Sequence, residues 1–389
     1  MDEDYKPLKK LFQLRKWDWD TENEADIIKS IKVRNKDDMY LYNYADACYV
    51  DRNHPVIMRC RGIVVREDGQ LLNYPFDRFF NDFEKEQSII DWNSAQIQEK
   101  LDGSLVCVFW SKDKWIVSTR GTFYPQNNPN LKHMDNTIDF EQLFRKYFTD
   151  DQFKKLKKEY CYTFELITPS NPIITKYPKS RMGIYLIGAR ELSLAKEVSQ
   201  LTLDHISELV DVGRPQIYEA SNINMCRELF TKLKFRDDEE GLVVVDSKSN
   251  RIKIKQKSYF KLSKIIALKE QDIFEYVLGK IELDGEYLQK CDEVTEKVNE
   301  IKEHWNKIIA IAKAKHIKII NFSSDNRKEY AQQACKYPYK SLLFAMMDRK
   351  DYTKFHLKWN DVKNWIGDDD GKLRHHNTRW LYSRRRRWY

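Results

Sequence analysis

The sequence has 389 residues, of which 41% are hydrophobic, 13% aromatic and 33% charged. This length corresponds to two or three domains, and the small numbers of glycine (12) and proline (10) exclude a fibrous or largely disordered chain. No apolar run approaches the ~18 residues of a membrane helix, and the acidic start lacks the apolar stretch of a secretory signal. Seven cysteines without a CxxC pair indicate neither a disulfide framework nor a zinc site, so we expect a reducing, cytoplasmic location and no membrane.

The net charge of +8 is concentrated in the C-terminal third of the chain. Residues 263–389 contain 26 Lys and Arg against 19 Asp and Glu, which leaves an excess of +1 for the remaining residues. The sharpest excess is the arginine run 384–387, within a tail (379–389) that also carries tryptophan and tyrosine. Arginines mixed with aromatic residues suit phosphate neutralisation and base stacking, so the tail suggests a nucleic-acid partner. A solvated charged tail without a partner is the alternative.

Up to about residue 262, short strand signals alternate with turns and a few helical stretches. The clearest is the apolar run 105–110, which a short polar turn joins to residues 115–119 as a predicted hairpin. Further strands are predicted at 61–66, 161–168, 184–190, 241–246 and 251–255, with helices around 140–160 and 221–233. From about residue 263 the spacing becomes helical, as in 286–318 and 327–347. The sequence therefore predicts an α+β fold, with a mixed domain over 1–262 and an all-α domain over 263–389.

One segment before the predicted hairpin carries candidate chemistry, while the phosphate loop GxxxxGK[ST] and the dinucleotide motif GxGxxG do not occur in the sequence. Lys100, Asp102 and Gly103 form a KxDG motif at the entry to the buried run. A glycine there allows close backbone approach to a ligand. A lysine becomes nucleophilic when neighbouring cations and desolvation lower its pKa. Taken alone, the motif fits a surface turn better.

Two later segments strengthen that hypothesis. The period of a strand places Lys253, Lys255 and Lys257 on one face, and like charges so close together favour a nearby polyanion. Glu240 precedes the predicted strand 241–246, and a carboxylate in this position suits Mg²⁺ or Mn²⁺ on a phosphate substrate. A plain exposed strand face and a simple turn are the respective alternatives.

The ordered set of KxDG, an acidic strand, EG and KxK resembles the covalent nucleotidyltransferases, which comprise ATP-dependent DNA and RNA ligases and mRNA capping enzymes. Longer matches indicate a resemblance to the phage RNA ligase 1 family. They are residues 164–171 (Phe-Glu-Leu-Ile-Thr-Pro-Ser-Asn) with 173–174 (Ile-Ile), 42–45 (Tyr-Asn-Tyr-Ala), 60–63 (Cys-Arg-Gly-Ile) and 78–81 (Arg-Phe-Phe-Asn). The resemblance covers residues 40–262 and implies a nucleotidyltransferase domain of antiparallel sheets flanked by helices.

The resemblance implies a three-step reaction. Lys100 would attack the α-phosphate of ATP and expel pyrophosphate, which leaves a lysyl-AMP, while Asp102 and Gly103 would shape the loop. AMP would pass to a 5′-phosphate end of single-stranded RNA, and a 3′-hydroxyl would then displace it. In the family, the break typically lies in a tRNA anticodon loop healed by a polynucleotide kinase/phosphatase, and the helical domain is credited with tRNA specificity.

The resemblance also assigns side chains around the nucleotide. Arg61 and Arg78 would hold the triphosphate, and Tyr42 and Glu165 would contact the nucleoside. Arg78 replaces a lysine of the family's type member, which keeps the charge and changes the donor geometry. Arg120 makes a similar replacement, and the assigned aromatic is Phe80, with the adjacent Phe79 as the alternative. Lys253 and Lys255 would contact the phosphates, and Tyr259 also matches a family position. The metal would be bound by Glu240, with Asp284 as a further ligand.

These assignments carry a physical expectation and leave two alternatives. Several cations around Lys100 should attract ATP and depress the pKa of its ammonium group. A DNA ligase or an RNA capping guanylyltransferase would usually carry an OB fold after the KxK strand, whereas this sequence becomes helical there. A non-catalytic basic RNA-binding protein would not need a nucleophilic lysine. We expect a monomer.

Overall fold

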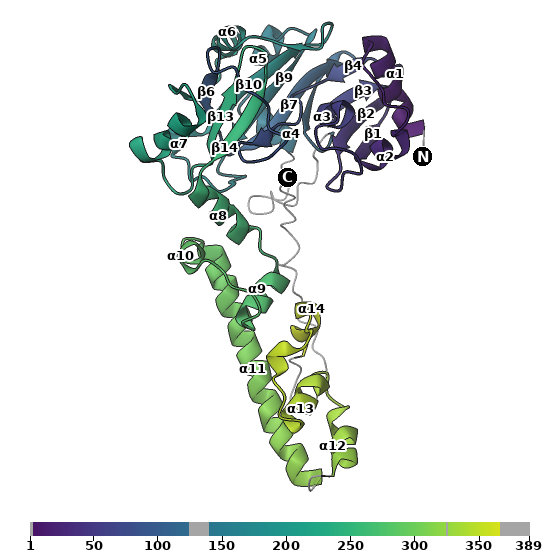
Figure 1. Cartoon of the computed structure of the whole chain (residues 1–389), viewed down its shortest axis with the longest axis vertical. Coiled ribbons are helices and arrows are strands. Elements are labelled where there is room, and N and C mark those ends of the chain that lie inside the picture. The colour runs from purple at the N-terminus through teal and green to yellow at the C-terminus, as the bar shows by residue number, and fades with distance from the viewer. Residues whose placement is uncertain (1–2, 124–139, 324–325, 366–389) are drawn as a thin grey trace. The chain divides into compact units, whose positions relative to one another are not determined.

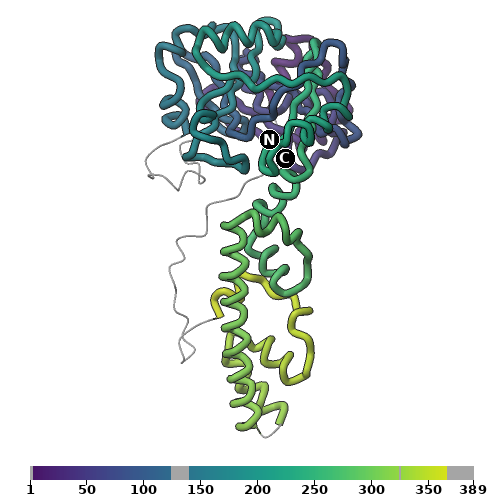
Figure 2. Tube along the Cα trace, turned by 90° about the vertical axis from the view of Figure 1, so that its left-hand side faces the viewer, coloured from purple at the N-terminus to yellow at the C-terminus, as the bar shows by residue number. Residues whose placement is uncertain are grey.

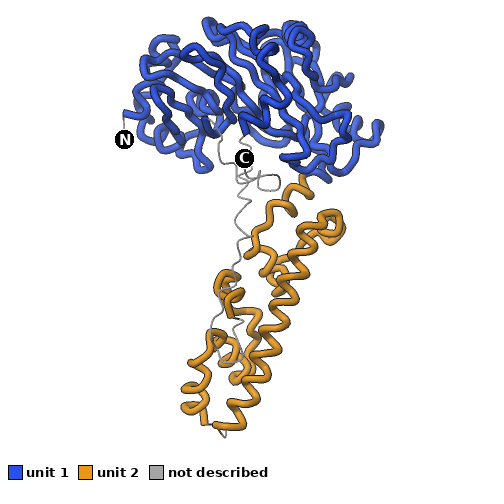
Figure 3. The backbone as a smooth tube through the Cα atoms, turned by 180° about the vertical axis from the view of Figure 1, so that it is seen from behind, with its two compact units in different colours: residues 1–259, 382–389 blue, residues 260–381 orange. Residues whose placement is uncertain are grey.

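A computed structural model describes residues 3–123, 140–323 and 326–365 of the chain. The predicted basic tail, 379–389, lies outside this part. The chain divides into two compact units, and the change from the first to the second falls between Tyr259 and Phe260 (Figure 3). The domain boundary predicted from the sequence lies three residues further along the chain.

The first sheet of unit 1 packs on both faces. Its strands, in spatial order, are β1 (Ile31–Lys36), β2 (Met39–Tyr44), β3 (Arg61–Arg66) and β4 (Leu71–Asn73). Helices α1 (Lys6–Arg15), α2 (Glu24–Lys29) and α3 (Pro55–Arg59) contribute to the core on one face. Because side chains alternate along a strand, Ile63 enters that core, whereas Val64 packs with Phe109 on the other face.

The second sheet contains the predicted hairpin. Its order is β11 (Lys196–Glu197), β10 (Gly183–Glu191), β9 (Tyr160–Ile167), β7 (Ser104–Ser111) and β8 (Lys114–Thr119), all antiparallel. Buried side chains of α4 (Phe140–Arg145), α5 (Asp150–Lys155) and α6 (Gln200–Val210) complete the core on one of its faces. The single helical stretch predicted around 140–160 is in fact two short helices, because Thr149 begins α5 with a capping box.

The third sheet carries most of the candidate site. Its order is β12 (Ile217–Tyr218), β6 (Gln96–Glu99), β13 (Gly241–Val245), β14 (Arg251–Lys255) and β5 (Phe80–Asn81), and only the β14–β5 pair is parallel. Side chains of α7 (Ile223–Lys232) pack against it. The prediction that Lys257 shares a strand face with Lys253 and Lys255 is wrong. After β14, the N–H of Gln256 donates to the carbonyl of Glu240, and Lys257 begins α8 (Lys257–Ile266).

Unit 2 is built around one long helix (Figures 1 and 2). Shorter helices accompany α11 (Asp292–Ser323), whose buried residues include Val294, Val298, Ile301, Trp305 and Ile308 at the three- and four-residue spacing of one helix face. They are α9 (Glu270–Val277), α10 (Gly285–Gln289), α12 (Arg327–Ala334), α13 (Lys340–Met347) and α14 (Trp359–Val362).

The helical character of the C-terminal region is confirmed, with two differences. The helical segment predicted over 286–318 is divided between α10 and α11, because residues 290–291 lie outside both helices. The helix predicted over 327–347 is broken between α12 and α13, where Pro338 lacks the N–H that a continuous helix needs. Within the described residues of unit 2 there are helices and no strand. Among the described residues of the whole chain, no helix is long and apolar enough to cross a membrane. The α+β class, with antiparallel sheets followed by helices, is therefore as predicted.

Candidate functional site

Strand pairing in the third sheet brings three predicted residues together. Strand β13 pairs with β6 on one side and β14 on the other, so Glu240, just before β13, lies between Lys100 and Lys255. Lys100 Nζ donates to Glu240 Oε2 at 2.6 Å, and Lys255 Nζ lies 2.9 Å from Glu240 Oε1. The Glu240 side chain is only 4% exposed, while the two lysines are 21% and 19% exposed. We call these three residues the carboxylate cluster.

Two glycines permit the close backbone approach at this site. Gly241 has φ +139°, and a Cβ there would lie 2.1 Å from the carbonyl oxygen of Ile254. A Cβ on Gly103 would lie 2.6 Å from the carbonyl oxygen of Leu166. The N–H of Gly103 donates to Glu165 Oε1 at 3.0 Å, which ties the KxDG loop to β9. Any larger residue would force these elements apart.

Asp102 anchors the loop that carries Lys100. Its buried carboxylate accepts hydrogen bonds from the N–H groups of Ile174 (2.8 Å) and Thr175 (2.7 Å) and from the hydroxyl of Tyr259 (2.8 Å). Its own N–H donates to the hydroxyl of Tyr177 at 2.9 Å. Asp102 and Tyr259 therefore position the loop. Sequence reasoning missed Tyr177, because one tyrosine in an irregular segment gives no periodic or spacing signal.

A second group of predicted residues surrounds an aromatic ring. Lys253 Nζ lies 5.1 Å from the ring centre of Phe79, and the guanidinium of Arg61 lies 5.3 Å from it. Arg61 Nη1 is buried and has no hydrogen-bond partner among the described residues. Burial, together with the charges of Lys100, Arg61 and Lys255, lowers the pKa of Lys253 to about 7. We call Arg61, Phe79 and Lys253 the cationic cluster; its unmatched donors suit an incoming anion.

The expected depression of the Lys100 pKa is wrong in this structure. Burial does act to lower the pKa of Lys100, but the charge of Glu240 and its hydrogen bond, aided by Glu165 and Asp102, outweigh burial and raise the pKa above its usual value. The sequence argument considered the cations around Lys100 and left out the carboxylate that touches it. In this arrangement Lys100 is an ammonium group and cannot act as a nucleophile.

The carboxylates of the site titrate differently from one another. Burial alone would raise the pKa of Glu240, but Lys100 and Lys255 lower it below its usual value. Glu165, in contrast, is not contacted by two lysines in the described part of the chain. Burial, assisted by Glu240 and Asp102, raises the pKa of Glu165 to about 8 against the opposing charge of Lys100. Glu165 therefore carries a proton over much of the neutral range, which lets it both donate and accept hydrogen bonds.

Arg78 and Arg120 meet at another residue that sequence reasoning did not single out. The Arg78 guanidinium lies 4.1 Å from the ring centre of Tyr44, and Arg120 Nη1 donates to the Tyr44 hydroxyl at 3.2 Å. Tyr44 and Arg120 are also among the groups whose charges act on Arg61. The predicted arginines thus form one neighbourhood organised by a tyrosine.

Three predicted site residues are placed differently. Phe80 is 1% exposed, with the guanidinium groups of Arg78 and Arg52 5.2 and 5.1 Å from its ring centre, so Phe79 is the aromatic that meets Lys253. Tyr42 is fully buried in the core beneath α1, because the alternation of β2 turns it inward. Its hydroxyl donates to the carbonyl of Asp4 at 2.7 Å.

Asp284, the further metal ligand predicted from the sequence, lies in unit 2. Its carboxylate is 2.9 Å from Lys261 Nζ and is partly exposed. The described residues contain no group of three or more His, Cys, Asp or Glu side chains that could hold a metal. A single carboxylate fits Mg²⁺ only when substrate phosphates complete the coordination, and Glu240, beside the cationic residues, is the residue suited to that role.

Comparisons with known proteins point to one family. Residues 59–265 match a family model described as RNA ligase. The chain is 24% identical to the RNA ligase of Rhodothermus phage RM378 over 390 aligned positions, which cover 82% of this chain and 87% of that protein. It is 30% identical over 257 residues to the putative bifunctional polynucleotide kinase/RNA ligase of Autographa californica nuclear polyhedrosis virus. That match covers 60% of this chain but only 35% of the viral protein.

Solved structures similar to this chain include an archaeal ATP-dependent RNA ligase, with a TM-score of 0.44 and 13% identity over 75% of this chain and 79% of that one. A putative ATP-dependent DNA ligase from Aquifex aeolicus gives a TM-score of 0.41 and 16% identity over 76% and 80% of the two chains.

Proposed function

The chain belongs to the RNA ligase family, since 207 of its 389 residues (59–265) match that family, and we propose that it uses ATP to join 5′-phosphate and 3′-hydroxyl ends of single-stranded RNA. The observation that carries this proposal is the contact of Lys100 with Glu240. Lys255 contacts the same carboxylate, and the charge of Lys100 acts on the pKa of Lys253. Phosphoryl transfer needs such positioning and charge neutralisation more than covalent help from the protein.

In the first step, Lys100 Nζ forms a bond to the α-phosphorus of ATP, and the bond from that phosphorus to the bridging oxygen breaks. Pyrophosphate leaves with the electron pair, and a lysyl-AMP remains. Lys100 must first leave Glu240 and lose its proton to water, because an ammonium group has no free electron pair. Arg61 and the charged form of Lys253 would bind the phosphates and stabilise the negative charge that develops in transfer.

Glu240 is the residue we assign to the divalent cation, Mg²⁺ or Mn²⁺, together with phosphate oxygens of ATP. Such an ion would polarise the transferring phosphate. Asp102 and Tyr259 would hold the Lys100 loop in register with β13 through the hydrogen bonds described above. Glu165, which accepts from Gly103 and carries a proton near neutral pH, is suited to bond the hydroxyl groups of a ribose.

The later steps transfer AMP to the 5′-phosphate of RNA and let a 3′-hydroxyl displace it. As natural substrate we propose RNA broken in a single-stranded region, such as a tRNA anticodon loop. Cooperation with a polynucleotide kinase/phosphatase is supported by the name of the Autographa californica nuclear polyhedrosis virus relative, which joins a kinase with a ligase. We assign RNA specificity to residues 263–389 and propose a monomer working in the cytoplasm, or the host cytoplasm for a viral protein. The seven cysteines all lie in the described part of the chain and form no disulfide there, which suits that reducing compartment.

Transfer of label from ATP to the protein tests this function. The protein is incubated with Mg²⁺ and α-labelled ATP, denatured, and examined for retained label. We expect labelling in the wild type and in Lys179→Ala, an exposed control, and none in Lys100→Ala. The same protein should then circularise a 5′-phosphorylated single-stranded RNA. Labelling from GTP would indicate a capping enzyme instead, and joining confined to nicked duplexes would contradict an RNA ligase of this type.

A further inference from the structure

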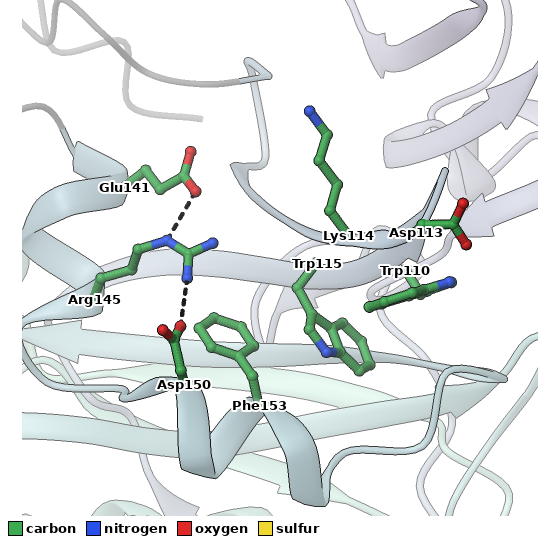
Figure 4. A pocket seen from close by; sticks show the side chains of 8 residues that line it. All are labelled: Trp110, Asp113, Lys114, Trp115, Glu141, Arg145, Asp150 and Phe153. Carbon is green, nitrogen blue, oxygen red and sulfur yellow. Dashed lines mark hydrogen bonds and ion pairs between the residues drawn. The ribbon is translucent and has the colours of Figure 1, made fainter.

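A row of aromatic rings, with a cation against the ring at each end, lies in unit 1 outside the candidate site. Lys158 Nζ is 3.8 Å from the ring centre of Trp110, which meets Trp115 edge-on at 5.3 Å. Trp115 stacks on Phe153 with 6.1 Å between ring centres and a 28° angle between planes, and the guanidinium of Arg145 lies 4.8 Å from the ring centre of Phe153. We call these five residues the aromatic row; Figure 4 shows all of them but Lys158.

All members of the row except Lys158 line a pocket between the β7–β8 hairpin and helices α4 and α5 (Figure 4). Trp110 and Trp115 are half-buried. Each indole ring contacts another ring of the row while part of it stays accessible. Rigid, partly exposed aromatic side chains offer a stacking surface at little cost in conformational entropy.

The charges of the pocket are arranged unequally. At one end the guanidinium of Arg145 lies 2.9 Å from Glu141 and 3.4 Å from Asp150, so one cation faces two carboxylates (Figure 4). At the other end Lys114 and Lys158 are exposed beside the tryptophans. Asp113 also lines that end. Lys158 therefore places a positive charge beside Trp110, at the end opposite to Glu141 and Asp150.

The pocket and the nucleotide site lie on different parts of β7. Lys100 precedes the start of this strand, and Trp110 is near its end, so six residues at about 3.3 Å each, roughly 20 Å in all, separate Ser104 from Trp110. Trp110 also shares a strand face with Val106 and Val108, which belong to the core beneath α4 and α5. Cys107, on the opposite strand face, is among the groups that act on Arg61.

We propose that the aromatic row binds single-stranded RNA at a nucleotide away from the ends being joined. A base would stack on the exposed part of Trp110 or Trp115, and Lys158 would neutralise an adjoining phosphate. Stacking on aromatic side chains beside cations is how proteins hold single strands without reading their sequence. This inference rests on the proposed function, because the aromatic row would be a second binding site for the same RNA substrate.

Binding of a fluorescently labelled single-stranded RNA, followed by fluorescence anisotropy, tests the proposal. Trp110→Ala and Lys158→Ala should each weaken binding, the tryptophan variant about tenfold. Trp110→Phe, which keeps a ring, should retain most of the affinity. The matched control Lys154→Ala removes an exposed charge from α5 without touching a ring of the row, and it should change little. A duplex of the same sequence, whose bases are already stacked, should bind all variants alike.

A second readout separates this proposal from the function of the lysine site. Labelling of Lys100 by ATP should be the same in the wild type, Trp110→Ala and Lys158→Ala, because neither residue belongs to that site. Loss of labelling in the wild type would overturn the proposed function. Normal labelling with unchanged RNA affinity in Lys158→Ala and Trp110→Ala would overturn the aromatic row alone. Cross-linking of wild-type protein to 4-thiouridine-containing RNA should mark the β7–β8 hairpin; cross-links elsewhere and none there would also contradict the proposal.

Discussion

The carboxylate cluster and the cationic cluster are linked by strand β14, which carries both Lys255 and Lys253, yet Lys100 and Lys253 are held in opposite states. Lys100 touches Glu240, and its pKa is raised. Lys253 lies beside Arg61 and Phe79, and its pKa falls to about 7. Both lysines are largely buried, so burial acts to lower the pKa of each. The difference teaches that one contacting carboxylate decides the protonation of a lysine more strongly than several cations nearby.

This contrast suggests a division of labour. Lys100, which must become a nucleophile, is held as an ammonium group on Glu240. Lys253, which must meet phosphate, has no carboxylate in contact within the described part of the chain. An arriving triphosphate would favour the charged form of Lys253. The same polyanion, together with a divalent ion on Glu240, would remove the contact that keeps Lys100 protonated.

The largest effect is expected for Glu240→Gln. Without the carboxylate, burial and the charges of Lys253 and Lys255 act on Lys100 unopposed by a contacting anion, so its pKa should fall below the usual lysine value. Reaction of Lys100 with a small acylating reagent, followed by mass spectrometry over a pH series, measures this directly. Labelling by ATP should nonetheless drop about 100-fold, because the lysine and the divalent ion lose their common anchor.

Glu239→Gln is the matched control, since Glu239 is the adjacent residue and pairs with Arg236 rather than with Lys100. It should leave both the acylation profile and ATP labelling unchanged. An unaltered acylation profile in Glu240→Gln would show that Glu240 does not govern the protonation of Lys100.

The second prediction concerns Lys253 and pH. Its folded-state pKa of about 7 lies below the value of about 10.4 for an unfolded chain, so between these pH values the unfolded chain binds more protons. The destabilisation of the folded state by the buried ammonium group of Lys253 is therefore fully present below pH 7 and decreases as the pH rises toward 10. Lys253→Met should therefore raise the free energy of unfolding by a few kcal/mol, on the order of the shift, at pH 6 and by much less at pH 10.

Urea unfolding of the wild type and of Lys253→Met at the two pH values gives this difference. Lys248→Met, at an exposed position before β14, serves as the control and should show no pH-dependent gain. A gain that is equal at pH 6 and pH 10 would mean that the charge of Lys253 is not the cause. ATP should also bind more tightly to the wild type at pH 6 than at pH 8.

Much of this site was accessible from the sequence because it depends on local rules. Lys100, Glu240, Lys253 and Lys255 lie at strand ends or on one strand face, and the two-residue period of a strand places them without knowledge of distant contacts. The strands 61–66, 105–110 and 251–255 were predictable for the same reason. Short motifs in a fixed order supplied the rest.

What the sequence could not give depends on pairs far apart in the chain. The protonation of Lys100 is set by a carboxylate 140 residues away. Tyr177 reaches Asp102 from a segment without regular structure, and Lys257 leaves the strand face because Gln256 bonds to Glu240 and the chain turns into α8. Which of two adjacent phenylalanines faces the cations depends on the parallel β14–β5 pairing, which no local pattern indicates.

The third prediction separates those two phenylalanines. Phe79 is half-buried against Lys253 and Arg61, so Phe79→Ala should raise the KM for ATP about tenfold through the loss of two cation–π contacts. Phe80 is buried, so Phe80→Ala should instead lower the free energy of unfolding by about 3–5 kcal/mol. Initial rates over a range of ATP concentrations and urea unfolding measure the two effects. Interchanged results would restore Phe80 as the ATP-binding aromatic.

The smallest effect is expected for Tyr42→Phe, a residue that the family resemblance placed at the nucleoside. The structure instead buries its ring beneath α1 and directs its hydroxyl to the carbonyl of Asp4. Removing the hydroxyl should cost about 1 kcal/mol of unfolding free energy and leave ATP labelling within twofold of wild type. Tyr259→Phe provides the contrast, because that hydroxyl bonds to Asp102 beneath the Lys100 loop, and its loss should slow labelling. Strong loss of labelling in a stably folded Tyr42→Phe would show that Tyr42 acts on the nucleotide after all, and that the core beneath α1 opens when ATP binds.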